Sequence, residues 1–207
     1  MAGIPTIHQY DLPDSNRLPG NTVSWRIDPS RALLLIHDMQ NYFLSPFPPT
    51  MRETLTANVA SLRSRCRQAG IPVAYTAHPG RMTDEERGLL RDFWGPGMET
   101  KPADRDVAAA VGPSPGDWIF TKWRYSAFFR TGLRERMREN GRDQLMLCGV
   151  YAHIGVLMSA VDAFTNDIQP FFFADGVADF SESHHHQALT YVAQRCGKVL
   201  TTKEALS

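Results

Sequence analysis

The chain of 207 residues fits one large domain, since a chain of this length buries roughly 70% of the surface that its unfolded form exposes. Its content of 43% hydrophobic and 21% charged residues is that of an ordinary globular protein. Because 22 basic residues balance 22 acidic ones, we expect no nucleic acid and no membrane surface among its partners.

The N-terminus has no basic segment followed by an apolar core, as a secretory signal would, and no apolar run is long enough for a membrane span. The three cysteines, Cys66, Cys148 and Cys196, are odd in number and widely spaced, which fits neither a disulfide framework nor a zinc site. We therefore expect reduced, mostly buried thiols in a cytoplasmic protein.

The chain begins with an irregular segment and then a strand. Residues 1–30 contain several prolines and glycines without sustained periodicity, which predicts an irregular arm on a single domain of residues 1–207. The run ALLLIHD follows, apolar throughout until its polar end, which is the pattern of a parallel strand buried on both faces. The carboxyl end of this strand carries Asp38.

The rest of the chain alternates between helical and strand patterns. Apolar residues recur at helical spacing from Leu55 to Cys66, Gly70 is well placed to end that helix, and IPVAYTA then predicts a strand. Further strands are expected at 117–121, 143–150, 169–174 and 198–202, and further helices around 126–139, 154–166 and 182–195. Six strands alternating with helices predict an α/β fold with a doubly wound, mostly parallel sheet and helices on both faces.

Segment 79–116 departs from this alternation. It contains PGRMTDEERGLLRDFWGPGM, a short helix candidate bracketed by proline and glycine. A connection of this length is typical of a functional loop or lid.

Ligands of an open parallel sheet bind at the carboxyl ends of its strands. Here those ends supply Asp38, His78, Lys122 and the turn 151–155. The Asp38 carboxyl should emerge in a partly dry pocket, where desolvation raises the pKa and suits a general acid; it could instead cap a loop. Lys122 could neutralise an anionic substrate or pair with Asp38, or it could be a surface lysine.

Two other features predict no site. The residues His184, His185 and His186 point roughly 100° apart on a predicted helix, so no two share a face as paired metal ligands do. Ser181 instead indicates an ordinary helix start. Cys148 lies inside a predicted buried strand, where thiols are inert.

The turn in CGVYAHIGV offers backbone N–H groups at a helix start, which suit an anion or a carbonyl oxygen, and Gly155 allows close approach of a ligand. Together with LLLIHDMQNYFL, AYTAHPG, RGLLRDFWGPG, TKWRYSAFF and DIQPFFFADGVADFS, this motif resembles the isochorismatases of the isochorismatase-like hydrolase superfamily. The resemblance runs nearly end to end and implies the six-stranded order 3-2-1-4-5-6.

The reaction that the resemblance implies depends on the residue at position 155. Amidase members of the superfamily are similar at the strand-end Asp and the Lys but carry a nucleophilic Cys where this chain has Gly155. The isochorismatase resemblance implies hydrolysis of a vinyl ether without nucleophile, metal or organic cofactor. Asp38 would protonate the methylene carbon of an enolpyruvyl group, water would capture the oxocarbenium ion, and the hemiketal would collapse to pyruvate.

The implied substrate is a small dicarboxylate. By the same resemblance Lys122 would lie beside Asp38 and the enolpyruvyl group, Arg87 would reach a carboxylate, and Tyr151 with the Gly155 N–H would hold the other polar groups.

Three further residues complete the expected pocket. Phe43 and Trp94 would form walls, although core packing explains Phe43 equally well. His78 stands where the family members have Gln, and its imidazole adds a possible charge near pH 6.5.

The match through the arm, and the lack of an aryl carrier domain after the isochorismatase-like domain, favour the phenazine-pathway type. That type hydrolyses 2-amino-2-deoxyisochorismate to trans-2,3-dihydro-3-hydroxyanthranilate and pyruvate, and also accepts isochorismate. A homodimer is implied as well. The alternatives are a siderophore-type isochorismatase, an amidase using Cys148, against which Gly155 counts, and a non-catalytic member, against which Asp38, Lys122 and Tyr151 count.

Overall fold

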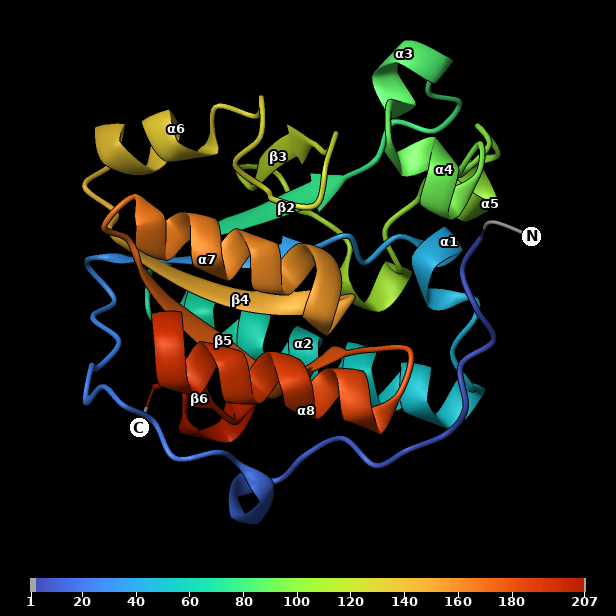
Figure 1. Cartoon of the computed structure of the whole chain (residues 1–207). Helices are drawn as coiled ribbons and strands as arrows, with labels where there is room; N and C mark the ends of the chain where they lie inside the picture. Colours follow the sequence, from blue (N-terminus) through green and yellow to red (C-terminus); the bar gives the residue numbers. More distant parts are fainter. Residues whose placement is uncertain (1–2, 207) are drawn as a thin grey trace.

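Six parallel strands form one sheet in the computed structural model, which describes residues 3–206 (Figure 1). The strands are β1 (Ala32–His37), β2 (Val73–Ala77), β3 (Trp118–Thr121), β4 (Gln144–Val150), β5 (Gln169–Ala178) and β6 (Lys198–Leu200). Their order is β3-β2-β1-β4-β5-β6, and every pair is parallel. The predicted doubly wound class and strand order are confirmed. The order reverses between β1 and β4, which is where such sheets bind ligands.

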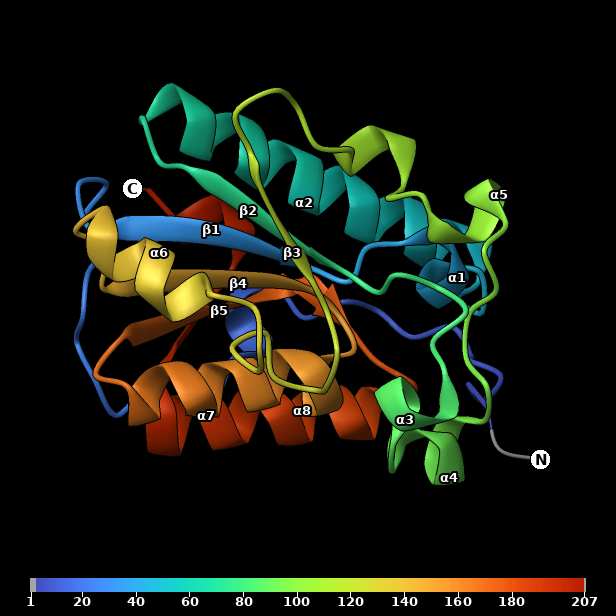
Figure 2. The ribbon, with the colours of Figure 1, turned by 90° about the horizontal axis from the view of Figure 1, so that it is seen from above.

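Helices cover both faces of the sheet (Figure 2). One face packs against α2 (Pro49–Gln68), and the other against α6 (Leu133–Glu139), α7 (Leu157–Thr165) and α8 (Glu182–Tyr191). The short helices α1 (Asn41–Leu44), α3 (Asp84–Arg87), α4 (Leu90–Trp94) and α5 (Pro102–Arg105) gather beyond the carboxyl ends of the central strands. Single 3-10 turns lie at Ser15–Arg17, Ala109–Val111 and Thr202–Glu204, and π-helical turns at Ala152–Val156 and Val192–Cys196.

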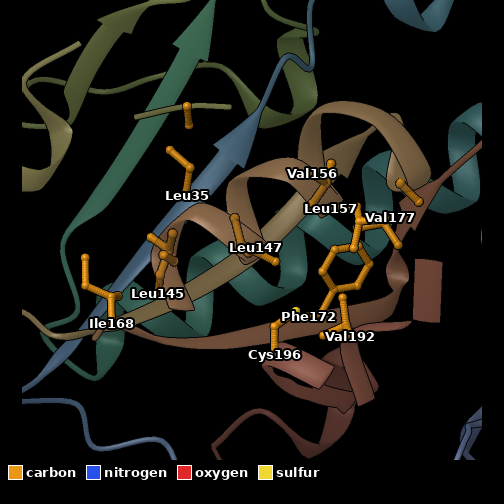
Figure 3. Packing of buried hydrophobic residues seen from close by; sticks show 14 of the residues in the cluster. Leu35, Leu145, Leu147, Val156, Leu157, Ile168, Phe172, Val177, Val192 and Cys196 are labelled. Carbon is orange, nitrogen blue, oxygen red and sulfur yellow. The ribbon is translucent and has the colours of Figure 1, made fainter. Parts of the chain in front are cut away.

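Alternating residues of the central strands build two separate cores. On β1, Leu34 and Ile36 pack toward α2, whereas Leu33 and Leu35 pack on the opposite face. Figure 3 shows the second core, in which Leu35, Leu145 and Leu147 meet side chains of the later helices. Each fully buried leucine contributes about 1.5–3 kcal/mol, so the continuous apolar runs fix both the strands and their burial.

Most predicted elements differ from the structure by a few residues at their ends, and two of these differences have a clear cause. The helix expected from residue 126 begins only at Leu133, because the Ser126 hydroxyl accepts from the Phe128 N–H and donates to Asp162, which holds this stretch in an irregular turn. The strand expected to end at residue 174 continues to Ala178. Leu147 pairs with Phe172 and Gly149 with Val177, so β5 bulges around Asp175, whose carboxylate accepts from Thr202.

The N-terminal arm is irregular, as predicted, and lies across the outer edge of the sheet and along α8 (Figure 1). The Asn21 side chain accepts from the Val199 N–H at 2.7 Å and donates to the Val199 carbonyl at 2.9 Å. This pairing covers the edge strand β6, whose backbone would otherwise be open to another chain. Within the part of the chain that the structure describes, no helix is long and apolar enough to cross a bilayer.

Candidate active site

The carboxyl group of Asp38 is fixed where β1 ends. Asp38 has a φ of 51°, in the left-handed region that aspartate tolerates better than most residues. Its N–H lies 3.3 Å from the Thr76 carbonyl oxygen and 3.2 Å from the Thr76 hydroxyl oxygen. That hydroxyl donates to Asp38 Oδ1 at 2.6 Å. The neighbouring strand β2 therefore orients this carboxylate.

The second oxygen of Asp38 faces three nitrogen atoms. Lys122 Nζ, carried just beyond β3, donates to Oδ2 at 3.1 Å. His37 Nδ1 lies 3.4 Å from the same oxygen and His78 Nε2 lies 3.5 Å from it. Asp38 is 5% exposed and Lys122 is 2% exposed, so this is a buried ion pair. The predicted meeting of these two strand-end residues is confirmed.

The surroundings reverse the expected pKa shift of Asp38. Burial alone would raise the pKa of this carboxyl, but His37, Lys122 and His78 together hold it well below its usual value. Because burial holds the pKa of His37 itself near 4, Lys122 is the charge that persists at neutral pH. The expectation that desolvation raises the pKa of Asp38 is therefore wrong. In the free protein Asp38 is an ionised carboxylate.

A pocket opens above this pair. All eight residues predicted from the sequence line it, namely Asp38, Phe43, His78, Arg87, Trp94, Lys122, Tyr151 and Gly155. The pocket is also lined by residues that the sequence did not indicate, among them Ile4, Tyr42, Met82, Met98, Arg124, Ile154 and Phe180.

Segment 79–116 folds over the pocket as a lid. The buried Arg87 guanidinium donates through Nε and Nη2 to the Gly95 carbonyl, at 3.2 and 2.9 Å. Its burial lowers the pKa of Arg87 from the usual arginine value. Arg124, beyond β3, donates to the Glu86 carbonyl at 2.6 Å and so attaches the lid to the sheet. The predicted lid thus forms one wall of the pocket.

The aromatic walls are held by their own polar groups. The Tyr151 hydroxyl donates to the Phe43 carbonyl at 2.6 Å, and its ring lies 4.5 Å from that of Phe180. The proton of this hydroxyl is thus engaged within the protein, which leaves its oxygen as an acceptor. Trp94 Nε1 donates to the Tyr125 hydroxyl at 2.9 Å, which fixes the indole in the lid.

Position 155 has no room for a side chain. A Cβ on Gly155 would overlap the His37 ring, lying 3.1 Å from Nε2 and closer still to Cε1, and would be 3.2 Å from the Tyr125 carbonyl oxygen. The His37 ring is itself held by its Nδ1 at 3.0 Å from the Val150 carbonyl oxygen. Cys148 is fully buried in β4, and burial raises the pKa of its thiol well above the usual value. Neither position presents a nucleophile.

A histidine cluster lies beside the pocket wall. His153 Nδ1 is 2.6 Å from Asp179 Oδ1, and the His184 ring stacks on His153 with centroids 4.3 Å apart and planes 10° apart. Because the two rings are parallel, their nitrogen lone pairs lie in parallel planes and do not converge on one ion. Ser181 accepts from the His184 N–H, which confirms the predicted helix start.

Some contacts at the site had no sequence signal. Thr76 lies inside a strand, and Ile4 belongs to the irregular arm, so only the tertiary fold brings them to Asp38 and to the pocket. Phe180 could have been found by the strand-end rule if β5 had been given its full length. Arg124 lies two residues after Lys122 in the same motif, but its position at the lid depends on the fold.

Comparisons with known proteins agree with one another. The isochorismatase domain family matches residues 32–204. A phenazine biosynthesis protein of Pseudomonas aeruginosa is 59% identical over 206 residues, covering 100% of both chains. Enterobactin synthase component B of Escherichia coli is 48% identical over 205 residues, covering 98% of this chain and 72% of that one. The crystal structure of a cysteine hydrolase from Pseudomonas syringae aligns with a TM-score of 0.80 at 24% identity, covering 92% and 96%, which shows a shared fold.

We predict that Gly155→Ala destabilises the protein by about 1–3 kcal/mol, because the added methyl group would overlap His37. The free energy of unfolding from urea titrations measures this. Gly20→Ala is the matched control, since nothing lies within 4 Å of a Cβ at that position. Equal unfolding midpoints for the two variants would contradict the packing described here.

Lys122→Met should destabilise the protein by about 3–5 kcal/mol at pH 7, because it leaves the buried Asp38 carboxylate without its ion pair. The wild-type pKa of Asp38 is depressed, so its contribution to stability is present above the unfolded pKa and disappears as the pH falls through the folded pKa. Without Lys122 the pKa of Asp38 rises, so the loss should shrink at pH 5. Urea titrations at both pH values measure this, and an equal loss at both would refute the ion pair.

Proposed function

Since the chain belongs to the isochorismatase family of hydrolases, we propose that it hydrolyses the enolpyruvyl vinyl ether of 2-amino-2-deoxyisochorismate, and also that of isochorismate. The products are trans-2,3-dihydro-3-hydroxyanthranilate and pyruvate from the first substrate, and 2,3-dihydro-2,3-dihydroxybenzoate and pyruvate from the second. The observation that carries the proposal is the Asp38 carboxylate beside Lys122 at the base of a pocket in which Gly155 leaves no nucleophile.

The reaction needs one acid and one water molecule. Asp38 donates a proton to the methylene carbon, and the π electrons of the double bond form the new C–H bond. The ether oxygen stabilises the cation that develops on the adjacent carbon. Water adds to the adjacent carbon and returns a proton to Asp38. The hemiketal then collapses. Its hydroxyl loses a proton and becomes the carbonyl of pyruvate, while the bond to the ring oxygen breaks and that oxygen takes up a proton to leave as the ring alcohol. The ring carbon–oxygen bond is never broken.

Asp38 must gain a proton before this sequence can begin, because it is ionised in the free protein. A dicarboxylate that enters the pocket adds negative charge and displaces water near Asp38. Both effects raise a carboxyl pKa. Lys122 then keeps the acid in place and balances the negative charge that returns to Asp38 after proton transfer. Substrate binding and activation of the acid are thereby linked.

The remaining pocket residues would orient the substrate. We assign one substrate carboxylate to Arg87, whose guanidinium keeps donor groups beyond those used on Gly95. The Gly155 N–H, at the start of the α7 segment, suits a second polar group of the substrate. Phe43 and Trp94 would enclose the six-membered ring, which places the methylene group over Asp38.

The phenazine-type substrate is favoured over isochorismate alone. The relative from Pseudomonas aeruginosa is named for phenazine biosynthesis and matches this chain along its full length at 59% identity. Enterobactin synthase component B matches at 48% identity over 72% of its length. Side-by-side kcat/KM values for the two substrates distinguish the assignments, and a preference for isochorismate would favour the siderophore type.

We also propose that the protein works in the cytoplasm as a homodimer with a small-molecule substrate as its partner. The three buried, unpaired cysteines suit a reducing compartment. Exposed apolar side chains at the edge of the sheet and on α7, including Ile119, Met158 and Phe164, suit a contact with a second copy. Sedimentation at micromolar concentration decides the oligomeric state, and a monomer there would refute the dimer.

Asp38→Asn should lower kcat for pyruvate release by about 100-fold or more, because the amide keeps the shape but has no transferable proton. A coupled pyruvate assay with each substrate measures this. Cys148→Ala is the control for a thiol mechanism and should retain turnover, since Cys148 is buried in β4. Retained activity in Asp38→Asn, or its loss in a folded Cys148→Ala protein, would reverse the assignment.

A further inference from the structure

The proposed reaction leaves two histidines beside Asp38 unused. His37 is fully buried with its Nδ1 3.0 Å from the Val150 carbonyl oxygen, whereas His78 lines the pocket. His78 Nε2 lies 3.5 Å from Asp38 Oδ2, and the His78 side chain is 12% exposed. That distance is slightly longer than a good hydrogen bond, and catalytic contacts commonly tighten when substrate binds. His78, Asp38 and Lys122 all line the same pocket. The imidazole can therefore exchange a proton with the carboxylate while both face a substrate.

The protein holds this imidazole in place. Buried Gln40 accepts from the His78 N–H at 2.7 Å and donates to the His78 carbonyl at 3.0 Å, so the backbone is clamped on both sides. The His78 ring lies 5.2 Å from the ring of Phe43. Neither contact involves the Nε2 that faces Asp38. This placement is what a proton-exchange partner of Asp38 requires.

We propose that His78 supplies the proton that Asp38 transfers to the substrate and takes it back after water adds, so that the two side chains share one proton. This inference rests on the proposed vinyl ether hydrolysis. His78 acts only through Asp38, by holding the proton next to its carboxylate, and does not itself react with the substrate.

The proton balance is closed. The protonated imidazole gives its Nε2 proton to Asp38 Oδ2, and Asp38 passes it to the methylene carbon. The added water loses one proton to Asp38, which returns it to Nε2 of His78. The imidazolium with a carboxylate and the imidazole with a carboxylic acid carry the same number of protons. His78 therefore provides a reservoir for an acid that is ionised in the free protein.

The groups around His78 set the direction of its pH dependence. Burial lowers the pKa of His78, Asp38 just after β1 raises it, and Lys122 beyond β3 and Arg87 on the lid lower it again. The pKa of His78 remains below its usual value, so the free pair takes up its proton only at a pH below the usual histidine pKa. Activity that needs this proton must rise as the pH falls from 8 toward 6.

The first experiment compares pH profiles of kcat/KM for pyruvate release by wild type, His78→Gln and the control His186→Gln, which changes a partly exposed histidine outside the pocket. For wild type we expect a roughly tenfold fall per pH unit above the pKa of the pair. In His78→Gln this descending part of the pH profile should move to lower pH, and activity at pH 7 should fall at least tenfold. The His186→Gln profile should follow that of wild type. The inference is overturned if the descending part of the His78→Gln profile does not move, or if His78→Gln lowers activity equally at every pH.

A second measurement does not require turnover or a folded His78 variant. In a nitrogen-15 NMR titration, Asp38→Asn should lower the pKa of His78 because it removes the facing anion. An unchanged His78 pKa overturns the shared proton. Failure of wild type to release pyruvate from either substrate is a different result, since it refutes the proposed function itself.

Discussion

The buried ion pair of Asp38 and Lys122 is the contact on which the rest of the site depends. Burying two charges costs several kcal/mol each, and only close geometry with further hydrogen bonds offsets this. Here Thr76 binds one carboxylate oxygen while Lys122 binds the other at 3.1 Å. The pair forms because the carboxyl ends of β1, β2 and β3 lie side by side, which in turn follows from the strand order.

Gly155 leaves the turn before α7 without a nucleophilic side chain in the pocket. A cysteine hydrolase shares the fold at a TM-score of 0.80, and a fold alone does not specify a reaction. In this chain the His37 ring fills the space that a side chain at position 155 would need. His37 and Gly155 therefore pack as a complementary pair, so a side chain at position 155 would require a change at His37 as well.

The sequence predicts the scaffold well because its signals are local. Apolar runs with polar ends define six strands, and the strand-end rule brings Asp38, His78 and Lys122 to one pocket, as found. The errors have physical causes. The Asp175–Gly176 pair has the composition of a turn but lies in a bulge of β5 held by Thr202, and the sign of the Asp38 pKa shift depends on side chains that only the fold assembles. Thr76 and Ile4 reach the site by tertiary packing alone.

The central claim is that Asp38 protonates carbon and that water attacks the enolpyruvyl side of the ether. Turnover of 2-amino-2-deoxyisochorismate in water enriched in oxygen-18, followed by mass spectrometry of the six-membered-ring product, tests it most directly. We predict that the ring hydroxyl carries no label, because the bond between the ring carbon and oxygen stays intact. Label in that hydroxyl would mean that water attacks the ring carbon, which would contradict carbon protonation by Asp38.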